Sequence, residues 1–185
     1  MAGPLEREIK LRFDSPAEAR TAVVGAGATL VRPRRLQSDV LLDTEAGALR
    51  DGRCALRVRV EPERAFLTFK GPPQPSSMKL REELETQAGD GHVLIDILER
   101  LGFLVWFRYE KYREEFSLGE VTIAIDETPV GTFVEIEGSA AGIHQAAASL
   151  GRGPLEYVLS SYRALFVQHC ADRGVEPTHM LFEAR

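Results

Sequence analysis

The feature that most constrains this chain is a regular alternation of charged and apolar residues along short segments. From Leu5 to Phe13, every even position is charged and most odd positions are apolar. Because successive side chains of a β-strand point to opposite faces, this segment predicts a strand with one charged face. The same alternation puts further charged residues on single strand faces, namely Arg57, Arg59, Lys79, Arg81, Glu83, Glu85, Lys111, Arg113, Asp126, Glu135 and Glu137.

Strand-like segments outnumber helical ones along the whole chain. The predicted strands cover about residues 5–13, 29–34, 36–44, 54–61, 65–70, 78–86, 103–118, 120–127 and 131–138. The predicted helices cover about residues 16–25, 90–101, 140–150 and 154–173. Ser15 and Pro16 are typical residues for the start of the first helix. We expect an α+β fold, an eight-stranded antiparallel β-barrel with peripheral helices.

The chain is expected to form one domain over residues 1–185. The loop at 71–77, rich in proline and serine, resembles a domain linker in composition. A barrel, however, needs the strands on both sides of it. The core is expected at about residues 5–173, followed by a tail at 174–185 that either docks on a mouth of the barrel or is frayed.

A charged face on an antiparallel sheet has two explanations. It often lies in water, and for any single strand that explanation is the simpler one. Here the charges are also sorted, with Glu-x-Glu at 6–8 and 135–137 and basic pairs at 57–59 and 111–113. The opposite faces are strongly apolar and need cover, which the helices are available to provide. We therefore expect the charged faces to point into the barrel.

A charged interior restricts the possible ligand, because buried ions need a partner or a metal. Carboxylates at positions i and i+2 of a strand supply the hard oxygen ligands that suit Mg²⁺ or Mn²⁺. Interior arginine and lysine side chains form charge-assisted contacts with phosphate oxygens. A metal-bound polyphosphate satisfies both groups, so the expected partner is a small-molecule triphosphate.

Composition argues against other classes of partner. The net charge of −5 is unusual for a general nucleic-acid binder, so none is expected. Cys54 and Cys170 follow no metal or redox spacing and are expected to be reduced thiols. The longest apolar stretch, about 95–107, is interrupted by Glu99 and Arg100 and is not expected to span a membrane. A cytoplasmic protein is expected, and a homodimer is left open.

The residues Glu6-Arg7-Glu8-Ile9-Lys10 resemble the ExExK signature of the CYTH superfamily, the triphosphate tunnel metalloenzymes. The resemblance continues in order through the residues 55–59, 67–72, 79–85, 110–113, 124–126 and 131–137, and it extends to Ser161-Tyr162. The family includes class IV adenylate cyclases, thiamine triphosphatases and inorganic triphosphatases. ExExK alone is a weak match, whereas the ordered series is specific.

The resemblance implies an eight-stranded tunnel with Mg²⁺ or Mn²⁺ as cofactor. It implies metal ligands at Glu6, Glu8, Glu135 and Glu137, with Asp126 as a further candidate. It implies phosphate ligands at Lys10, Arg57, Arg59, Lys70 and Arg113, with Arg81 and Lys111 as further candidates. Glu83 and Glu85 either bind metal or hold the arginines in place, and we favour the second role.

Several reactions remain open within this family. We expect hydrolysis of tripolyphosphate or a nucleoside triphosphate, with adenylate cyclase, thiamine triphosphatase and non-catalytic nucleotide binding as alternatives. The residues 109–113 and 131–135 are most similar to the class IV cyclases, and the arginine strand carries no aromatic residue that could stack on thiamine. A lipocalin-like barrel for an apolar ligand would require an apolar lumen.

Two residues receive a specific expectation. Lys10 is the candidate catalytic proton acceptor, because burial and neighbouring cations would lower its pKa. The alternative is that Lys10 is simply a phosphate ligand. Trp106 is expected to pack in the core or on the outer wall and not to serve as a platform for a base.

Overall fold

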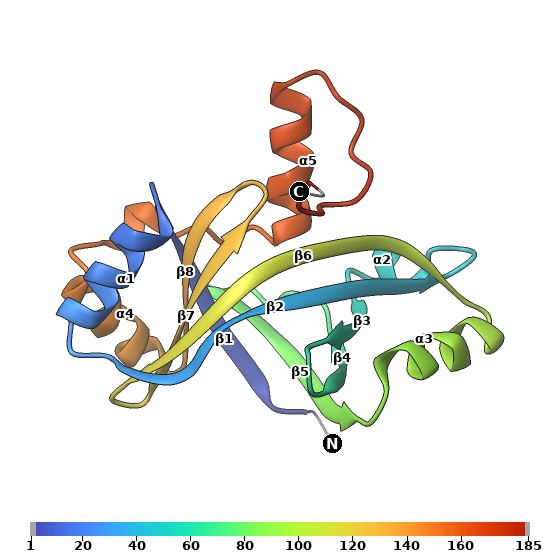
Figure 1. The fold of residues 1–185 in the computed structure, drawn as a ribbon, viewed down its shortest axis with the longest axis horizontal. Helices are drawn as coiled ribbons and strands as arrows, with labels where there is room; N and C mark the ends of the chain where they lie inside the picture. The colour runs from blue at the N-terminus through green and yellow to red at the C-terminus, as the bar shows by residue number, and fades with distance from the viewer. Residues whose placement is uncertain (1–2, 184–185) are drawn as a thin grey trace.

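Eight strands close into an antiparallel barrel in the computed structural model, which describes residues 3–183 (Figure 1). The order around the barrel is β1-β5-β4-β3-β2-β6-β7-β8. The strands are β1 (Leu5–Phe13), β2 (Thr29–Thr44), β3 (Ala55–Val60), β4 (Ala65–Lys70), β5 (Lys79–Ala88), β6 (Phe103–Leu118), β7 (Val121–Thr128) and β8 (Gly131–Glu137). The predicted eight-stranded barrel with peripheral helices is confirmed.

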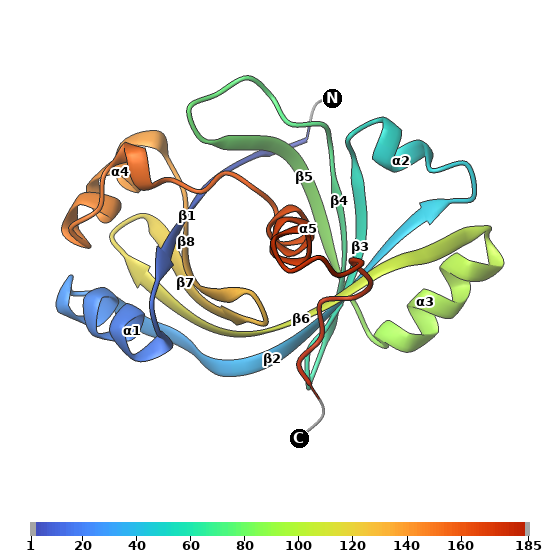
Figure 2. The same cartoon turned by 90° about the horizontal axis from the view of Figure 1, so that it is seen from above.

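The helices lie outside the barrel or over one of its openings (Figure 2). They are α1 (Pro16–Gly25), α2 (Ala48–Asp51), α3 (Gly91–Arg100), α4 (Ala140–Ser149) and α5 (Tyr162–Asp172), with a 3₁₀ turn at Pro154–Glu156. Ser15, Asp90, Ser139 and Ser161 each accept a backbone N–H in the first turn of the helix that follows. This side-chain capping explains where these four helices begin. No helix within residues 3–183 is long and apolar enough to cross a membrane.

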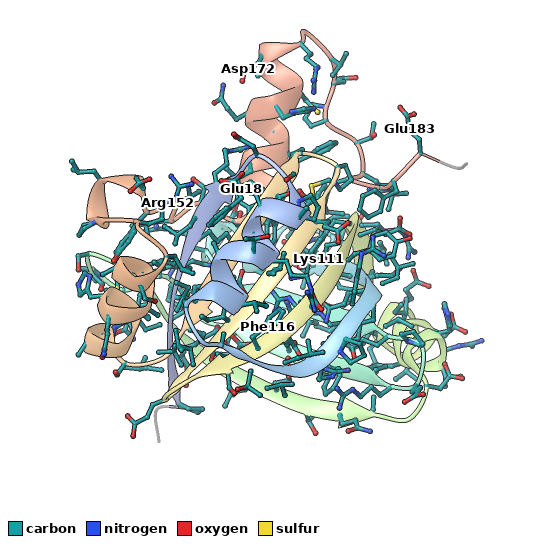
Figure 3. All side chains as sticks on the ribbon, turned by 60° about the vertical axis from the view of Figure 1, so that its left-hand side comes forward. Glu18, Lys111, Phe116, Arg152, Asp172 and Glu183 are labelled. Atoms are coloured by element: carbon teal, nitrogen blue, oxygen red, sulfur yellow. The ribbon has the colours of Figure 1, made fainter. Side chains whose placement is uncertain are left out.

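The apolar core lies between the barrel wall and the helices. α1 and α4 cover the outer faces of β1, β7 and β8, and α3 covers β3 and β6. Ile9, Leu11 and Ile136 are fully buried in the first of these layers, together with Phe116 (Figure 3). Because these residues alternate with the charged ones, burying the apolar face outward leaves the charged face for the interior of the barrel.

The strand predicted in two pieces, 29–34 and 36–44, is continuous. β2 pairs with β6 over its whole length and absorbs three register shifts, between Leu30 and Arg32, between Arg32 and Arg35, and between Leu41 and Leu42. Pro33 lies in the second shift, where its missing N–H is tolerated because the ladder is already interrupted. The sequence predicted two separate strands here, but pairing with the long strand β6 keeps the segment continuous.

The predicted helix at 154–173 is wrong in its first half. The segment between the 3₁₀ turn and α5 is extended, and Val158 exchanges two backbone hydrogen bonds with Lys10, at 3.1 and 2.8 Å. β5 pairs only with residues 5–8 of β1, so Lys10 would otherwise have an open edge. Pairing with that edge outweighs helix formation, and α5 starts only at Tyr162.

The C-terminal tail packs against the barrel. It is described as far as Glu183, and positions 184–185 of the predicted tail lie outside the described residues. β7 pairs with only the second half of β6, from Tyr112 onward, so the first half has a free edge. The Met180 N–H donates to the Arg108 carbonyl at 3.0 Å, and the Glu110 N–H donates to the Met180 carbonyl at 2.9 Å. The Met180 side chain is fully buried beside Phe107 and Tyr109.

Met180→Ala should lower the free energy of unfolding by about 2–5 kcal/mol, because it removes a fully buried side chain from a packed layer. Chemical denaturation followed by circular dichroism measures this. Leu181→Ala is the matched control, since Leu181 is 43% exposed and should change stability by less than about 1 kcal/mol. Equal losses in the two variants would contradict docking of the tail.

Candidate active site in the barrel interior

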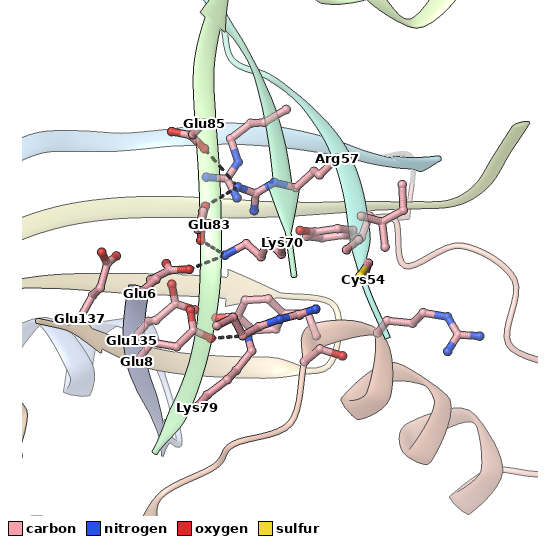
Figure 4. Close-up of a pocket in the computed structure, with 18 of the residues that line it drawn as sticks. Glu6, Glu8, Cys54, Arg57, Lys70, Lys79, Glu83, Glu85, Glu135 and Glu137 are labelled. Atoms are coloured by element: carbon pink, nitrogen blue, oxygen red, sulfur yellow. Dashed lines mark hydrogen bonds and ion pairs between the residues drawn. The ribbon is translucent and has the colours of Figure 1, made fainter. Parts of the chain in front are cut away.

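The barrel encloses a cavity of about 900 Å³ lined by charged side chains (Figure 4). The charged lining residues are Glu6, Glu8, Lys10, Arg50, Arg53, Arg57, Arg59, Lys70, Lys79, Arg81, Glu83, Glu85, Lys111, Arg113, Glu115, Glu135, Glu137 and Arg163. They include every predicted metal or phosphate ligand except Asp126. The prediction that the charged faces point inward is confirmed, and it excludes an apolar-ligand barrel.

Four glutamates gather where β1 meets β8. The antiparallel register pairs Glu8 with Glu137 and Lys10 with Glu135, and Glu6 lies two residues before Glu8 on the same face. The Lys10 ammonium lies 2.7 Å from Glu8 and 3.2 Å from Glu135. This strand pairing turns two Glu-x-Glu motifs, far apart in sequence, into one acidic cluster.

Glu137 is the member of this cluster that lacks a cationic partner. No lysine or arginine of the described chain lies within 4.0 Å of its carboxylate, although each of the other three has one. Although part of the side chain is exposed, burial and then the negative charges of Glu6, Glu135 and Glu8 raise its pKa to about 7. Within the described residues, Glu137 is thus the carboxylate of this cluster whose charge no adjacent cation balances.

The donors of this cluster fit a hard divalent cation. Carboxylate oxygens are the ligands that Mg²⁺ and Mn²⁺ prefer, and a cation beside Glu137 would relieve the repulsion that raises its pKa. Within residues 3–183 no three acidic, histidine or cysteine side chains converge as a preformed metal site. Lysines hold the carboxylates instead, because Lys70 contacts Glu6 and Lys79 contacts Glu8.

Arg57 and Arg59 project from β3 on either side of a buried aspartate. Asp39 of β2 lies 2.9 Å from the Arg59 Nε and 3.5 Å from the Arg57 Nε. Burial acts to raise the pKa of Asp39, but the charges of Arg59 and Arg57 outweigh it and the pKa is lowered. Asp39 was not predicted as a site residue. The sequence did not single it out, because its strand also carries Asp43 and several other polar residues, and only the register places it directly opposite Arg59.

Glu83 and Glu85 hold cations, as favoured from the sequence. Glu83 of β5 contacts the Lys70 ammonium and lies 3.9 Å from Arg57. Glu85 lies 3.4 Å from Arg57 and accepts a hydrogen bond from the Thr68 hydroxyl at 2.7 Å. These contacts direct the two basic side chains toward the cavity (Figure 4).

The candidate assignment of Asp126 to metal is corrected by its surroundings. Asp126 is fully buried and does not line the cavity. Its carboxylate accepts two hydrogen bonds from Arg113 at 2.6 Å, one from Lys111 at 3.0 Å and one from the Tyr162 hydroxyl at 2.6 Å. Both oxygens are occupied by donors, so Asp126 positions basic side chains and is not placed to bind a cation.

The premise for Lys10 as a proton acceptor is also wrong. Burial acts to lower the pKa of Lys10, but the carboxylates of Glu8 and Glu135 outweigh burial, and the pKa lies above its ordinary value. The shift expected for Lys10 occurs instead at Lys111, where burial and then the charge of Arg113 lower the pKa to about 7 despite Asp126. Lys10 is therefore charged, and the alternative that it is a phosphate ligand stays a prediction.

The N-terminus of α5 enters the site. Figure 2 shows α5 end-on over the ring of strands, and Ser161, Tyr162 and Arg163 line the cavity. The Lys10 and Lys111 ammonium groups lie 5.2 and 5.1 Å from the centre of the Tyr162 ring. Trp106 also lines the cavity, so its assignment to packing alone is incomplete. In the sequence, only the resemblance at Ser161-Tyr162 pointed to this helix.

Beyond Arg59 along the same face, an ion-pair network surrounds Glu61. The Glu61 carboxylate accepts hydrogen bonds from Arg32 at 2.5 Å, from Gln37 at 2.5 Å and from Arg64 at 3.1 Å. Burial acts to raise its pKa, but these three hydrogen bonds outweigh burial and lower the pKa to about 2. The same carboxyl in an unfolded chain has a pKa of about 4.5.

This difference predicts a pH-dependent stability. A lowered folded-state pKa stabilises the protein above pH 4.5, and the contribution is lost as the pH falls toward 2. Glu61→Gln removes it, so the difference in unfolding free energy between the parent and Glu61→Gln should shrink by up to about 3 kcal/mol over that range. Urea denaturation at a series of pH values measures it, with exposed Glu99→Gln as control. A difference independent of pH would contradict the role of Glu61.

Comparisons with known proteins agree with this geometry. The profile of the CYTH domain matches residues 4–152. A Methanocaldococcus jannaschii protein provisionally named an adenylate cyclase is 28% identical over 142 residues, which cover 76% of this chain and 81% of that protein.

Two solved structures share the fold. One, from Vibrio parahaemolyticus and also provisionally named an adenylate cyclase, has a TM-score of 0.78 at 19% identity and covers 88% of this chain and 98% of that one. The other, a Hippeastrum protein named as a candidate adenylyl cyclase with a dominant triphosphatase activity, has a TM-score of 0.66 at 20% identity and covers 89% and 96%. With a family profile that spans most of its length, a matching barrel and the charged interior, this chain belongs to the CYTH domain family.

Proposed function

We propose that this chain is a divalent-metal-dependent enzyme that binds a triphosphate inside the barrel and hydrolyses it. The observation that carries the proposal is the division of the cavity into a basic and an acidic part. Basic side chains of β1, β3 and β4 face the cavity beside an acidic cluster whose member Glu137 lacks a cation. Tripolyphosphate or a nucleoside triphosphate, bound with its metal, supplies the charges that each part lacks.

The basic residues are arranged to take phosphate oxygens. Arg57 lines the cavity, and it is held there by ion pairs with Asp39 and Glu85. Arg59 and Lys70 reach the cavity from neighbouring strands and are oriented by Asp39 and Glu83. Phosphoryl transfer depends on holding the phosphates in line and on neutralising their charge, which this arrangement supports.

The acidic cluster provides the candidate metal site. Glu6, Glu8, Glu135 and Glu137 would hold Mg²⁺ or Mn²⁺, and the bound ion would neutralise phosphate oxygens. Lys111 replaces Lys10 as the candidate proton acceptor, since its pKa of about 7 lets its Nζ exchange a proton near neutral pH. Asp126 and Tyr162 hold Lys111 and Arg113 in position.

Adenylate cyclase is the second candidate. The relatives from M. jannaschii and V. parahaemolyticus carry that name, and the Hippeastrum protein combines it with a dominant triphosphatase activity. The protein should be incubated with ATP, tripolyphosphate and thiamine triphosphate with each metal. Chromatography then distinguishes cyclic AMP and pyrophosphate from ADP and orthophosphate. Release of orthophosphate would support hydrolysis. Cyclic AMP as the main product would show that the protein is a cyclase and would contradict the proposed hydrolysis.

Glu137→Gln should raise the metal concentration needed for half-maximal activity by at least roughly tenfold. A tenfold increase corresponds to a loss of about 1.4 kcal/mol in the free energy of metal binding. The amide keeps the size of the side chain but removes the negative charge that a hard cation requires. Activity assays across a metal titration measure the shift, with exposed Glu120→Gln as the matched control. An unchanged metal requirement in Glu137→Gln would argue against this metal site.

Tripolyphosphate should raise the melting temperature more than chloride does at equal ionic strength. A ligand that binds only the folded state stabilises it by about 2.7 kcal/mol at a hundredfold excess over its dissociation constant. Arg57→Ala should reduce this gain, whereas Arg20→Ala, which removes an arginine of α1 outside the barrel, should not. Equal shifts with chloride and tripolyphosphate in a thermal scan would refute the phosphate site.

A further inference from the structure

A β-bulge places Trp106 at the cavity. In the register of β2 and β6, Leu41 pairs with Phe107 and Leu42 pairs with Val105, so Trp106 is an additional residue on β6. Leu41 lines the cavity, whereas Leu42 and Val105 pack outside the barrel with α3. A bulge re-aims the side chain that it inserts, and here Trp106 joins the lining of the cavity.

Two arginines from different elements flank the indole ring. The Arg50 guanidinium carbon, from α2, lies 5.0 Å from the ring centre. The Arg163 guanidinium carbon, from the first turn of α5, lies 4.7 Å from it. Both arginines also line the cavity. Asp43 pairs with Arg50 at 2.9 Å, but no carboxylate of residues 3–183 lies within 4.0 Å of the Arg163 guanidinium. Planar and cationic groups thus converge on one side of the cavity.

The distance from this group to the phosphate-binding residues suits a nucleoside. Arg57 pairs with Leu41, and Leu41 pairs with Phe107, the neighbour of Trp106. Two strand spacings therefore separate Arg57 from the bulge, or roughly 10 Å between backbones. Leu41 provides an apolar surface between them. Phosphates held at Arg57 would leave space for a ribose in this interval, with the base at Trp106.

We propose that Trp106, together with Arg50 and Arg163, forms a subsite for the base of a nucleoside triphosphate. The proposal rests on the proposed function, because it assumes that the phosphates bind at Arg57 and Arg59. The base stacks on the indole ring or on a guanidinium plane, both of which accept the face of any base. The subsite therefore favours nucleoside triphosphates over tripolyphosphate, which has no group to place there.

Trp106 is the single tryptophan of the chain, so tryptophan emission, excited selectively at wavelengths where tyrosine does not absorb, reports on this residue. The protein should be titrated with ATP and, separately, with tripolyphosphate in the presence of a chelator, which prevents metal-dependent turnover. We expect saturating ATP to quench the emission strongly and tripolyphosphate to change it much less. Equal changes with the two ligands would overturn the proposal, because both would then act through the phosphates.

Steady-state kinetics provide the second test. Trp106→Ala should raise the KM for ATP by roughly 5- to 150-fold, the range expected for the loss of one stacked base. The KM for tripolyphosphate should stay within about twofold, which also shows that the variant is folded. Trp106→Phe should restore most of the affinity for ATP. Equal increases for both substrates would show that Trp106 only packs, and would overturn the subsite.

Tyr112→Ala is the matched control. Tyr112 lies on the same strand and carries an arginine over its ring, with the Arg34 guanidinium carbon 3.7 Å from the centre, but it does not line the cavity. It should leave the preference between ATP and tripolyphosphate unchanged, and a loss equal to that of Trp106→Ala would overturn the assignment. Should the parent quench with ATP but hydrolyse neither substrate, the subsite stands and the proposed hydrolysis fails.

Discussion

Ionised side chains inside a closed barrel must each meet an opposite charge, water or a ligand, and this constraint organises the protein. Two buried aspartates meet it for the basic side chains. Asp39 lies between Arg57 and Arg59, and Asp126 joins Lys111 to Arg113. Neither aspartate is exposed, so each acts by holding cations in position. The basic part of the cavity is therefore preorganised before any ligand binds.

Charge pairing is incomplete at the other side of the cavity. Lys10 bridges Glu8 and Glu135, but Glu137 has no such cation, and burial together with the neighbouring carboxylates raises its pKa to about 7. The two buried lysines, Lys10 and Lys111, differ in their charged neighbours and therefore in the direction of their pKa shifts. Carboxylates on both sides keep Lys10 charged, whereas burial and then the charge of Arg113 lower the pKa of Lys111 to about 7. The charge states of the two lysines are thus set by different neighbours.

The satisfaction of strand edges also shapes the site. The strands of the barrel have unequal lengths, so backbone groups of β1 near Lys10 and of β6 near Tyr109 have no neighbouring strand. Val158 covers the first edge and Met180 covers the second. Because α5 lies between these two attachments in the chain, it is held over the barrel, with Tyr162 and Arg163 at the cavity. Backbone pairing at these two edges thereby completes the cavity wall.

The alternation of residues by itself determined that the charged strand faces line the cavity, because period two is a local property of a strand and the apolar face had to be covered. It led correctly to Glu6, Arg57 and Glu135, and the ordered motifs indicated the family. Only the tertiary structure decided which charges meet. The neighbours of Lys10 and Asp126, and the bulge at Trp106, depend on the register between strands distant in sequence. A pKa or a free coordination position depends on those neighbours, so no local pattern could reveal it.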